Sequence, residues 1–435
     1  MALGGVFMID TDGNIGRDSE PISDAICGLL FDISGQTGFW TTGAGATLAG
    51  TFKDTVVEFN SLDEVKESGL KAYSGTGDFL FGVPYYHIKH FFDINPAGRL
   101  YVAFADCKDD WNALIDMQRA ANGDISQFGV WTEQSLWRET DAEAETYALN
   151  IVADIQAVAY SLANDYYAPA PVVLNANTAK VKTASGTNDT VVLSKIPSCL
   201  GKNRYVSVFL GQGIDTDVKA MHLAVTSATP VGNVGAALGC LSVANVGECI
   251  GHVQPYNLQA YFPDIEMGFG DVTKAEGGYK NTMRYSSLSR RNLDTLDTLG
   301  YNMLIKYMGY GSNVYFSDDK TCSDGDYNTI SRNRVINKSR RGVRMALLPY
   351  VNSPIKIDPT NGTLSASQIT VFENRVKDVL NAMVSANEIA AVASVSIPAG
   401  QNILKNDMLK IRYSLIPLGK SKRIEVTEGL AISQQ

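Results

Sequence analysis

The sequence predicts a mixed α/β fold, and three observations support this prediction. Short apolar segments typical of buried strands alternate with amphipathic segments typical of helices along most of the 435 residues. The composition, 45% apolar and 19% charged, is that of an ordinary folded chain. The chain also ends on β-structure, because two alternating apolar segments follow its last amphipathic helix. A chain of this length is expected to form two or three domains.

The first hundred residues alternate between strand and helix signals. The apolar segments of this part are 4–9, 22–33, 55–59 and 100–105. Between them, Ser61 can cap a helix that ends at Gly69, and a second helix is expected over 85–92. The Gly- and Thr-rich stretch 35–50 is interpreted as a loop. This order predicts an α/β unit.

The middle of the chain repeats that alternation. Strands are expected over 128–131, 172–174, 205–210 and 312–316. Helices are expected over 111–121, 142–164 and 218–246, and around Leu293, Leu296 and Leu299. In the long helix 142–164, apolar residues recur at helical spacing, which indicates a buried stripe. Residues 175–190 and 251–278 are expected to be surface loops.

The C-terminal part predicts a helix over 367–386, followed by strands at 392–397, 409–415 and 423–426. A turn at 398–400 separates the first two strands. Strands near a terminus leave backbone N–H and C=O groups unpaired, and two strands alone are marginally stable. We therefore expect their edges to be covered within the fold or by another chain.

The charge distribution is uneven. A net charge of -9 argues against a general nucleic-acid binder, which needs a basic surface. Acidic residues gather at 141–154, whereas a basic run without acids contains Arg332, Arg334, Lys338, Arg340, Arg341 and Arg344. The basic run is interpreted as a contact between protein subunits, with a solvated loop or a phosphate or nucleic-acid site as the alternatives.

Cellular location is constrained by three absences. The six cysteines have no C-x-x-C spacing and are expected to be reduced and mostly buried. The N-terminus lacks the basic and apolar regions of a signal peptide, and no eighteen apolar residues run together. The sequence therefore predicts synthesis in the cytoplasm and no direct membrane insertion.

Motifs that carry chemistry are few. An apolar strand delivers Asp10 and Asp12 in a D-x-D-G pattern, which resembles the first motif of haloacid-dehalogenase-type phosphatases. The turn chemistry of Asp-Gly-Asn, however, favours a plain turn at these residues. His87 and His90 have a spacing that can bind metal, but they lack a third ligand and are expected to be core residues. Gly211 and Gly213 make only a weak phosphate-loop signal. No catalytic residue, cofactor or metal is predicted.

Several segments taken in order resemble contractile tail sheath proteins. The N-terminal resemblance rests on 22–30, on 55–65 with Gly69, and on Phe91-Phe92 followed by 98–102. The C-terminal resemblance rests on 372–380, Val395, 409–415 and 424–426. The chain departs from the family pattern at 311–316 and at Arg340-Arg341, where many sheaths have a Gly-Trp-Gly-x-Arg-Thr segment before a Tyr-rich Arg pair.

The resemblance implies a core domain built from both chain ends with an outer α/β insertion. Residues 1–30 would supply an N-terminal arm and a core strand, 31–279 the insertion, and 280–435 the C-terminal core with a strand arm over about 405–435. Strand exchange between subunits is expected to involve Leu409, Ile411, Tyr413, Leu415, Ile424, Val426, Val6, Phe7 and Ile9. The six basic residues at 332–344 are expected to face a neighbouring subunit or the tube.

The function implied by the resemblance is structural and not enzymatic. Such a subunit polymerises around an inner tube and contracts to drive the tube through a target envelope. The implied partners are other copies of the chain, an inner tube protein, and baseplate and tail-terminator proteins. The subunit would be assembled in the bacterial cytoplasm and become part of a phage virion or contractile injection particle. The phosphatase and another virion structural protein are the alternatives.

Overall fold

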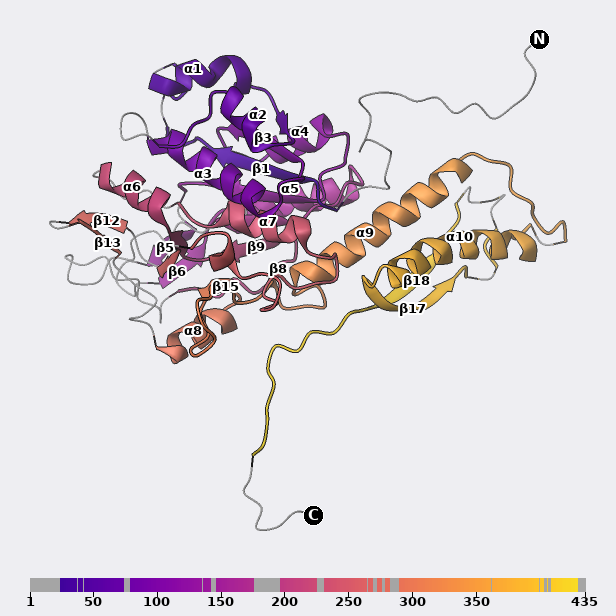
Figure 1. Cartoon of the computed structure of the whole chain (residues 1–435). Coiled ribbons are helices and arrows are strands. Elements are labelled where there is room, and N and C mark those ends of the chain that lie inside the picture. Colours follow the sequence, from indigo (N-terminus) through magenta and orange to yellow (C-terminus); the bar gives the residue numbers. More distant parts are fainter. Residues whose placement is uncertain are drawn as a thin grey trace, which may run out of the picture.

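The computed structural model describes residues 24–428 with short gaps, and Figure 1 shows the arrangement of its elements. The gaps are residues 37, 42, 74–78, 135, 142–145, 176–195, 225–230, 264, 269–271, 276–277, 282–288, 361, 399, 403–404 and 406–407. The described chain forms a large α/β body, from which a long helix leads to a smaller C-terminal unit (Figure 1).

The body is built on a six-stranded sheet with the order β2-β3-β1-β4-β7-β9. Its strands are β1 (Cys27–Asp32), β2 (Val57–Phe59), β3 (Leu100–Ala105), β4 (Gln127–Trp131), β7 (Val172–Asn175) and β9 (Val206–Phe209). All neighbours are parallel except β2, which pairs antiparallel with β3 at one edge. The predicted strands at 55–59, 100–105, 128–131, 172–174 and 205–210 are confirmed.

Helices cover both faces of this sheet, as continuous apolar strands require. The helices of the body are α1 (Gly43–Phe52), α2 (Leu62–Glu67), α3 (Phe79–Ile94), α4 (Ala113–Ala120), α5 (Val152–Asn164), α6 (Thr216–Ala224), α7 (Val234–Val243) and α8 (Arg290–Thr298). Leu29 and Phe31 of β1 enter one apolar core, and Leu30 between them enters the core on the opposite face. Ser61 caps α2 as predicted, since its Oγ accepts a hydrogen bond from the Glu64 N–H.

The body also contains small strand pairs and a 3₁₀ turn, and a second 3₁₀ turn lies beyond it. The pairs are β5 (Trp137–Asp141) with β6 (Thr146–Leu149), β10 (Gln212–Ile214) with β11 (Glu266–Gly268), β12 (Val272–Ala275) with β13 (Gly278–Asn281), β14 (Leu304–Ile305) with β15 (Tyr315–Phe316), and β8 (Lys202–Asn203) with β16 (Cys322–Ser323). The 3₁₀ turns are η2 (Leu258–Ala260) in the body and η4 (Leu348–Tyr350) beyond it.

Three predictions about the body were wrong in extent. The expected helix 142–164 begins only at Val152, because Ile151 takes a left-handed backbone (φ 53°) and the β5–β6 hairpin precedes it. The expected loop 35–50 contains most of α1. The expected surface loop 251–278 contains η2, β11 and β12. The predicted strand 4–9 and the predicted loop at 175–190, except Asn175 at the end of β7, lie outside the described residues.

The predicted apolar region 218–246 divides into α6 and α7, and α7 packs closely against α3. A Cβ added at Gly235 would lie 2.1 Å from the His87 carbonyl oxygen, so only glycine permits this approach of the two helices. Among the described helices, none is both long and apolar enough to cross a bilayer.

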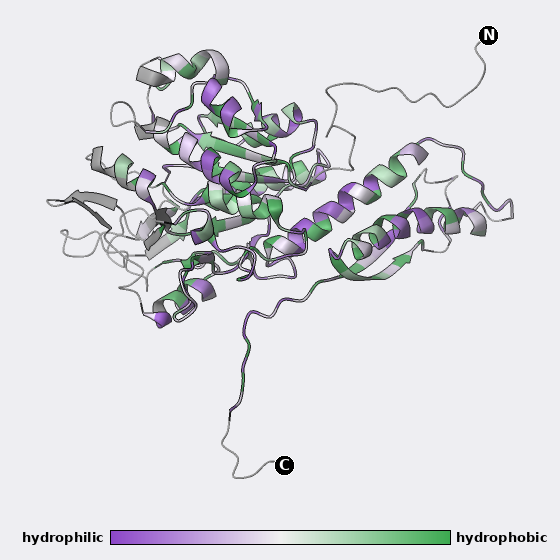
Figure 2. Cartoon of the chain, viewed as in Figure 1, coloured by the Kyte–Doolittle hydropathy of each residue, from purple (hydrophilic) through white to green (hydrophobic). Residues whose placement is uncertain are grey.

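The C-terminal unit contains one helix and one hairpin sheet. Helix α9 (Ile330–Leu347) runs from the body, and η4 ends it. Helix α10 (Ala366–Ser385) then packs on the antiparallel pair β17 (Ile389–Ser396) and β18 (Arg412–Pro417). The predicted helix 367–386 and the strands at 392–397 and 409–415 are thus confirmed with small shifts. Figure 2 shows that much of α9 is hydrophilic, unlike the strands of the large sheet.

The large sheet bears on the expected division of the chain. The expected boundary between residues 30 and 31 falls inside β1, which pairs with β3 on one side and β4 on the other. The described part of segment 1–30 therefore belongs to the same sheet as strands from segment 31–279. The separation that the structure does display lies later, between the body and the unit of α10, β17 and β18 (Figure 1).

Candidate functional site: the terminal arm and its attachment

The β17–β18 sheet packs one face on α10 and leaves the other to solvent. Ile411, Tyr413 and Leu415 point toward α10 and join the apolar cluster around Val376 and Leu380. The alternate residues of β18, which are Arg412, Ser414 and Ile416, are exposed. This alternation is the pattern of a half-buried strand, as the sequence predicted.

Backbone pairing within the sheet shows which of the residues expected to exchange between subunits already have a partner strand in their own chain. Tyr413 pairs with Val395, and Leu415 pairs with Val392, so β18 has a partner in its own chain. Leu409 lies before β18 and packs in a second small apolar cluster near Phe372. The sheet has only these two strands in the described chain, and each strand keeps one open edge. Of the residues 409–415, those from Arg412 onward lie in β18, which keeps one edge open in the described chain.

The terminal arm, which we define as residues 418–428, leaves the unit after β18. The expected strand 423–426 has no strand partner in the described chain. Ile424 is 79% exposed and Val426 is 83% exposed, although both side chains are apolar. The other expected exchange residues, Val6, Phe7 and Ile9, lie outside the described residues, as do Asp10 and Asp12.

The root of the arm is attached to the body by two lysines. The Lys420 ammonium contacts the carboxylate of Asp318 and lies 2.6 Å from Asp319 Oδ1. The Lys422 ammonium lies 2.6 Å from Asp318 Oδ2 and 2.7 Å from Asp297 Oδ1. We call these five residues the arm latch. Sequence reasoning missed it, because the lysines and their partners are more than a hundred residues apart.

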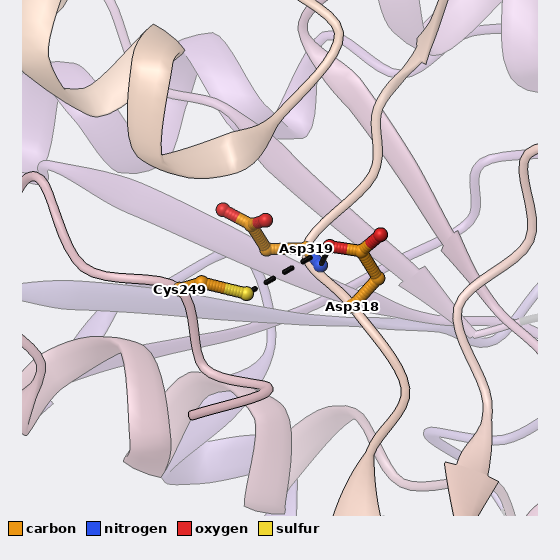
Figure 3. A group of neighbouring side chains, drawn as sticks. All are labelled: Cys249, Asp318 and Asp319. Atoms are coloured by element: carbon orange, nitrogen blue, oxygen red, sulfur yellow. Dashed lines mark hydrogen bonds between the residues drawn. The ribbon is translucent and has the colours of Figure 1, made fainter. Parts of the chain in front are cut away.

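The acidic side of the latch has the composition of a metal site. Cys249, Asp318 and Asp319 bring ligand atoms within 4.8 Å of one another, and Figure 3 shows that Cys249 comes from one segment and the two aspartates from another. The Lys420 ammonium, however, bonds to both carboxylates and supplies the positive charge that they need. Burial raises the pKa of Cys249, so its side chain is a neutral thiol beside the two carboxylates. The residues therefore fit an ion-pair cluster better than a metal centre.

The basic run 332–344 forms one helix, α9, and its side chains point in several directions. Arg334 and Arg341 are buried, which corrects the expectation that all six residues face outward. Arg334 donates to the Ala244 carbonyl, and Arg340 donates to Ala163 and Tyr205 in the body. Only two of the six are exposed in the single chain, Arg332 and Arg344. The solvated-loop alternative is wrong for the same reason.

Lys338 joins the start of the described chain to the C-terminal unit. Its ammonium lies 2.6 Å from Asp24 Oδ2, and it also bonds to Glu388 immediately before β17. Arg341 holds the other oxygen of Asp24 at 2.6 Å. Burial by itself would lower the pKa of Lys338, but the two carboxylates outweigh it and raise that pKa. The helix is thus fixed to both neighbours by charge.

The two spaced histidines are core residues, as expected. His87 accepts from the Gly235 N–H at Nδ1, and its Nε2 lies 2.7 Å from the Val231 carbonyl. Burial lowers the pKa of His87 to about 3, which keeps the ring neutral. His90 pairs with Asp215 instead of a metal. The weak Gly211/Gly213 signal falls at β10, which pairs with β11 in a two-stranded sheet.

Comparison with known proteins gives one family model for the C-terminal part and solved structures for the fold of the whole chain. A family model described as "DUF2586, C-terminal domain" matches residues 326–435, which include α9, α10 and both strands of the small sheet. No curated protein matches the chain. Solved structures match across nearly the whole chain at low sequence identity.

Three of these solved structures are cryo-EM structures of contractile systems. The PVC sheath complex of an extracellular contractile injection system, in the contracted state, has 11% identity and a TM-score of 0.57, covering 99% of this chain and 98% of that chain. The contracted helical sheath of the anti-feeding prophage has 14% identity and a TM-score of 0.55, with 99% of each chain covered. The baseplate of that prophage has 12% identity and a TM-score of 0.54, covering 99% of this chain and 100% of that chain. The chain therefore has the fold of the sheath proteins of contractile injection systems, as the sequence resemblance predicted.

Proposed function

We propose that this chain is a structural sheath subunit, which polymerises around an inner tube and contracts to drive the tube through a target envelope. Its partners are other copies of itself, the tube protein, and baseplate and tail-terminator proteins. It is assembled in the bacterial cytoplasm and becomes part of a phage virion or contractile injection particle. The fold shared with two contracted sheaths and a baseplate supports this assignment.

The observation that carries the proposal is the mismatch between the small sheet and the arm. The sheet has two strands and open edges, whereas the arm has an extended backbone and apolar side chains at Ile424 and Val426 that nothing covers in the described chain. An arm from one copy can complete the sheet of another by β-augmentation, which supplies main-chain hydrogen bonds and pockets for alternate side chains. Leu409, Ile411, Tyr413 and Leu415 then belong to the receiving sheet. Val6, Phe7 and Ile9 are proposed to add a further strand.

Strand exchange suits a sheath that changes shape. Backbone pairing joins two copies through a flexible connection, so the bodies can rotate as rigid units while the connection persists. Arg332 and Arg344 remain candidates for charged contacts with a neighbour or the tube, because they are exposed on α9.

Negative-stain microscopy of the purified chain tests this function. Striated tubes or stacked rings are expected, and a monodisperse monomer that hydrolyses a phosphate ester would contradict the proposal. Short oligomers that never elongate would favour another virion structural protein.

Strand exchange is tested separately by Ile424→Asp with Val426→Asp, which removes the apolar side chains of the arm. We expect assembly to be lost while the circular dichroism spectrum stays unchanged, since neither side chain packs within the described chain. The matched control is Arg423→Ala with Glu425→Ala, on the alternate positions of the same segment. Tubes formed equally well by both double variants would overturn exchange through this arm.

A further inference from the structure

The lysines of the arm latch pair with buried carboxylates that would otherwise destabilise the fold. Asp318 and Asp319 are adjacent carboxylates, and both side chains are almost fully buried. Burial raises the pKa of Asp318, but Lys420 and Lys422 outweigh that effect and hold the pKa well below its usual range. Leaving buried charges without a partner strongly destabilises a fold. The buried carboxylates of Asp318 and Asp319 thus take their cations from the arm, whereas Asp297 also pairs with Lys320 of the body.

The lysines occupy a particular position along the chain. They follow the end of β18 at Pro417 and precede the two exposed apolar residues of the arm. From Lys422 to Ile424 the chain extends over two residues, which is about 7 Å at most. Without the latch, Ile424 lies seven positions after Pro417, and a flexible segment of that length has an end-to-end distance of about 15 Å.

We propose that Lys420 and Lys422 are positioning residues, which hold the root of the arm on Asp297, Asp318 and Asp319 so that Ile424 and Val426 are presented to a second copy of this chain. This inference rests on the proposed function. The latch reduces the volume that the apolar tip explores and so raises its effective concentration at the neighbouring sheet. It also ties the arm to the body instead of to the small unit alone.

The latch has a defined response to salt and pH. Its carboxylate with a lowered pKa contributes fully above the ordinary value of 3.8, and that contribution is lost as the pH falls toward the folded pKa. The aspartates overcome burial and raise the pKa of Lys420, so its contribution is complete below 10.5 and is lost only at still higher pH. The latch is thus constant between about pH 5 and 9 but weakened by salt, because Lys420 and Lys422 are partly exposed.

Limited trypsin digestion measures the latch directly in the full-length chain. Trypsin needs an accessible lysine or arginine side chain. The wild type should therefore be cut after Arg423, which is 82% exposed and pairs only with the exposed Glu425 in the described chain, and slowly after Lys420. In the variant Asp318→Asn with Asp319→Asn, cleavage after Lys420 is expected to become about as fast as after Arg423. The same faster cleavage after Lys420 is expected for the wild type when the salt concentration is raised. Equal cleavage at both positions in the wild type at low salt would overturn the latch.

Assembly of Lys420→Gln with Lys422→Gln measures the consequence of losing the latch. The concentration needed for tube formation is expected to rise about tenfold, as the loss of effective concentration requires. The matched control is Arg423→Gln, which removes one positive charge from the same segment but no residue of the latch. Melting temperatures of both variants show whether the body stays folded. The single variant Asp318→Asn removes one carboxylate of the latch and is expected to raise the concentration needed for tube formation by less. An assembly threshold equal to that of Arg423→Gln would overturn the proposal.

The two proposals fail in different ways. If the wild type never assembles, the sheath function fails, while trypsin digestion still reports on the latch. If the wild type assembles and Lys420→Gln with Lys422→Gln assembles equally well, only the positioning role fails.

Discussion

The body and the C-terminal unit use the same kinds of element but differ in completeness. The large sheet of the body has six strands with helices over both faces, and the residues of β1 are all buried. The unit has two strands with one helix on one face, and most residues of β17 and β18 are partly or fully exposed. Two-stranded sheets are marginal alone. The large sheet thus has both faces covered within the described chain, whereas the small sheet leaves one face and two edges open.

The attachments of the unit follow from this incompleteness. Its contacts with the body include charged ones, at Lys338 with Asp24 and Glu388 and at the arm latch, and a small apolar one, since Val246 packs in the apolar cluster of the unit. Charged contacts are directional, whereas apolar cores are close-packed and resist sliding. The small unit is thus held in position without being fused into the large core.

The largest expected effect comes from truncating a core leucine in each region. Leu29→Ala in β1 is expected to lower the free energy of unfolding by about 4 kcal/mol, because Leu29 is fully buried within the larger core. Leu380→Ala in α10 is expected to cost about 2–3 kcal/mol, since the smaller cluster can relax around the cavity. Urea titration of each variant measures the two values.

Assembly should distinguish these two leucine variants further. A neighbour that completes the small sheet stabilises Leu380→Ala by mass action, so tubes should restore much of its lost stability but little of that lost by Leu29→Ala. Equal recovery in both variants would mean that the body, too, depends on its neighbours.

A medium effect is expected where the two regions meet. Lys338→Met leaves the carboxylates of Asp24 and Glu388 without their shared cation and should cost about 2 kcal/mol, less than a fully buried pair because Lys338 is 32% exposed. The matched control, Arg332→Met on the same helix, is exposed and should cost under about 0.5 kcal/mol. Thermal unfolding measures both.

A double-mutant cycle sharpens the assignment at Lys338. Adding Glu388→Gln to Lys338→Met removes the carboxylate charge that has lost its cation, because Asp24 keeps its bond to Arg341, and is expected to recover part of the lost stability. Strictly additive costs would show that Lys338 and Glu388 act independently, contrary to their contact in the structure.

Sequence periodicity predicted most of the body and of the small unit for a simple reason. Strands such as β3 and helices such as α10 bury one or two faces, and burial imposes a repeat that is visible in the chain. The helix expected at 142–164 was wrong in its first half. Ala and Glu favour a helix locally there, but Trp137 packs against Tyr301, and β5 and β6 pair as a hairpin instead. Tertiary packing overrode propensity there.

The attachment sites were harder to predict, because charge complementarity depends on distant residues. The basic run at 332–344 reads as one surface, but the helical period turns Arg334 and Arg341 inward. The carboxylate that pairs with Arg341 is Asp24, 317 positions earlier. Asp318-Asp319 and the lysines near the C-terminus were visible as charges of opposite sign. Nothing local in the sequence joins them.

The smallest expected effect tests whether the body tolerates a local defect without any consequence for assembly. Ser61→Ala removes the side-chain oxygen that accepts from the Glu64 N–H at the start of α2, and it should cost about 1 kcal/mol. Helix α2 belongs to the body and lies far along the chain from the arm, so the assembly threshold should stay at the wild-type value. Ser61→Asp is the matched variant, since aspartate also caps helices and should restore the stability. A raised threshold in Ser61→Ala alone would show that subunit contacts reach the edge of the large sheet, and the distinction between a complete body and an incomplete unit would then have to be redrawn.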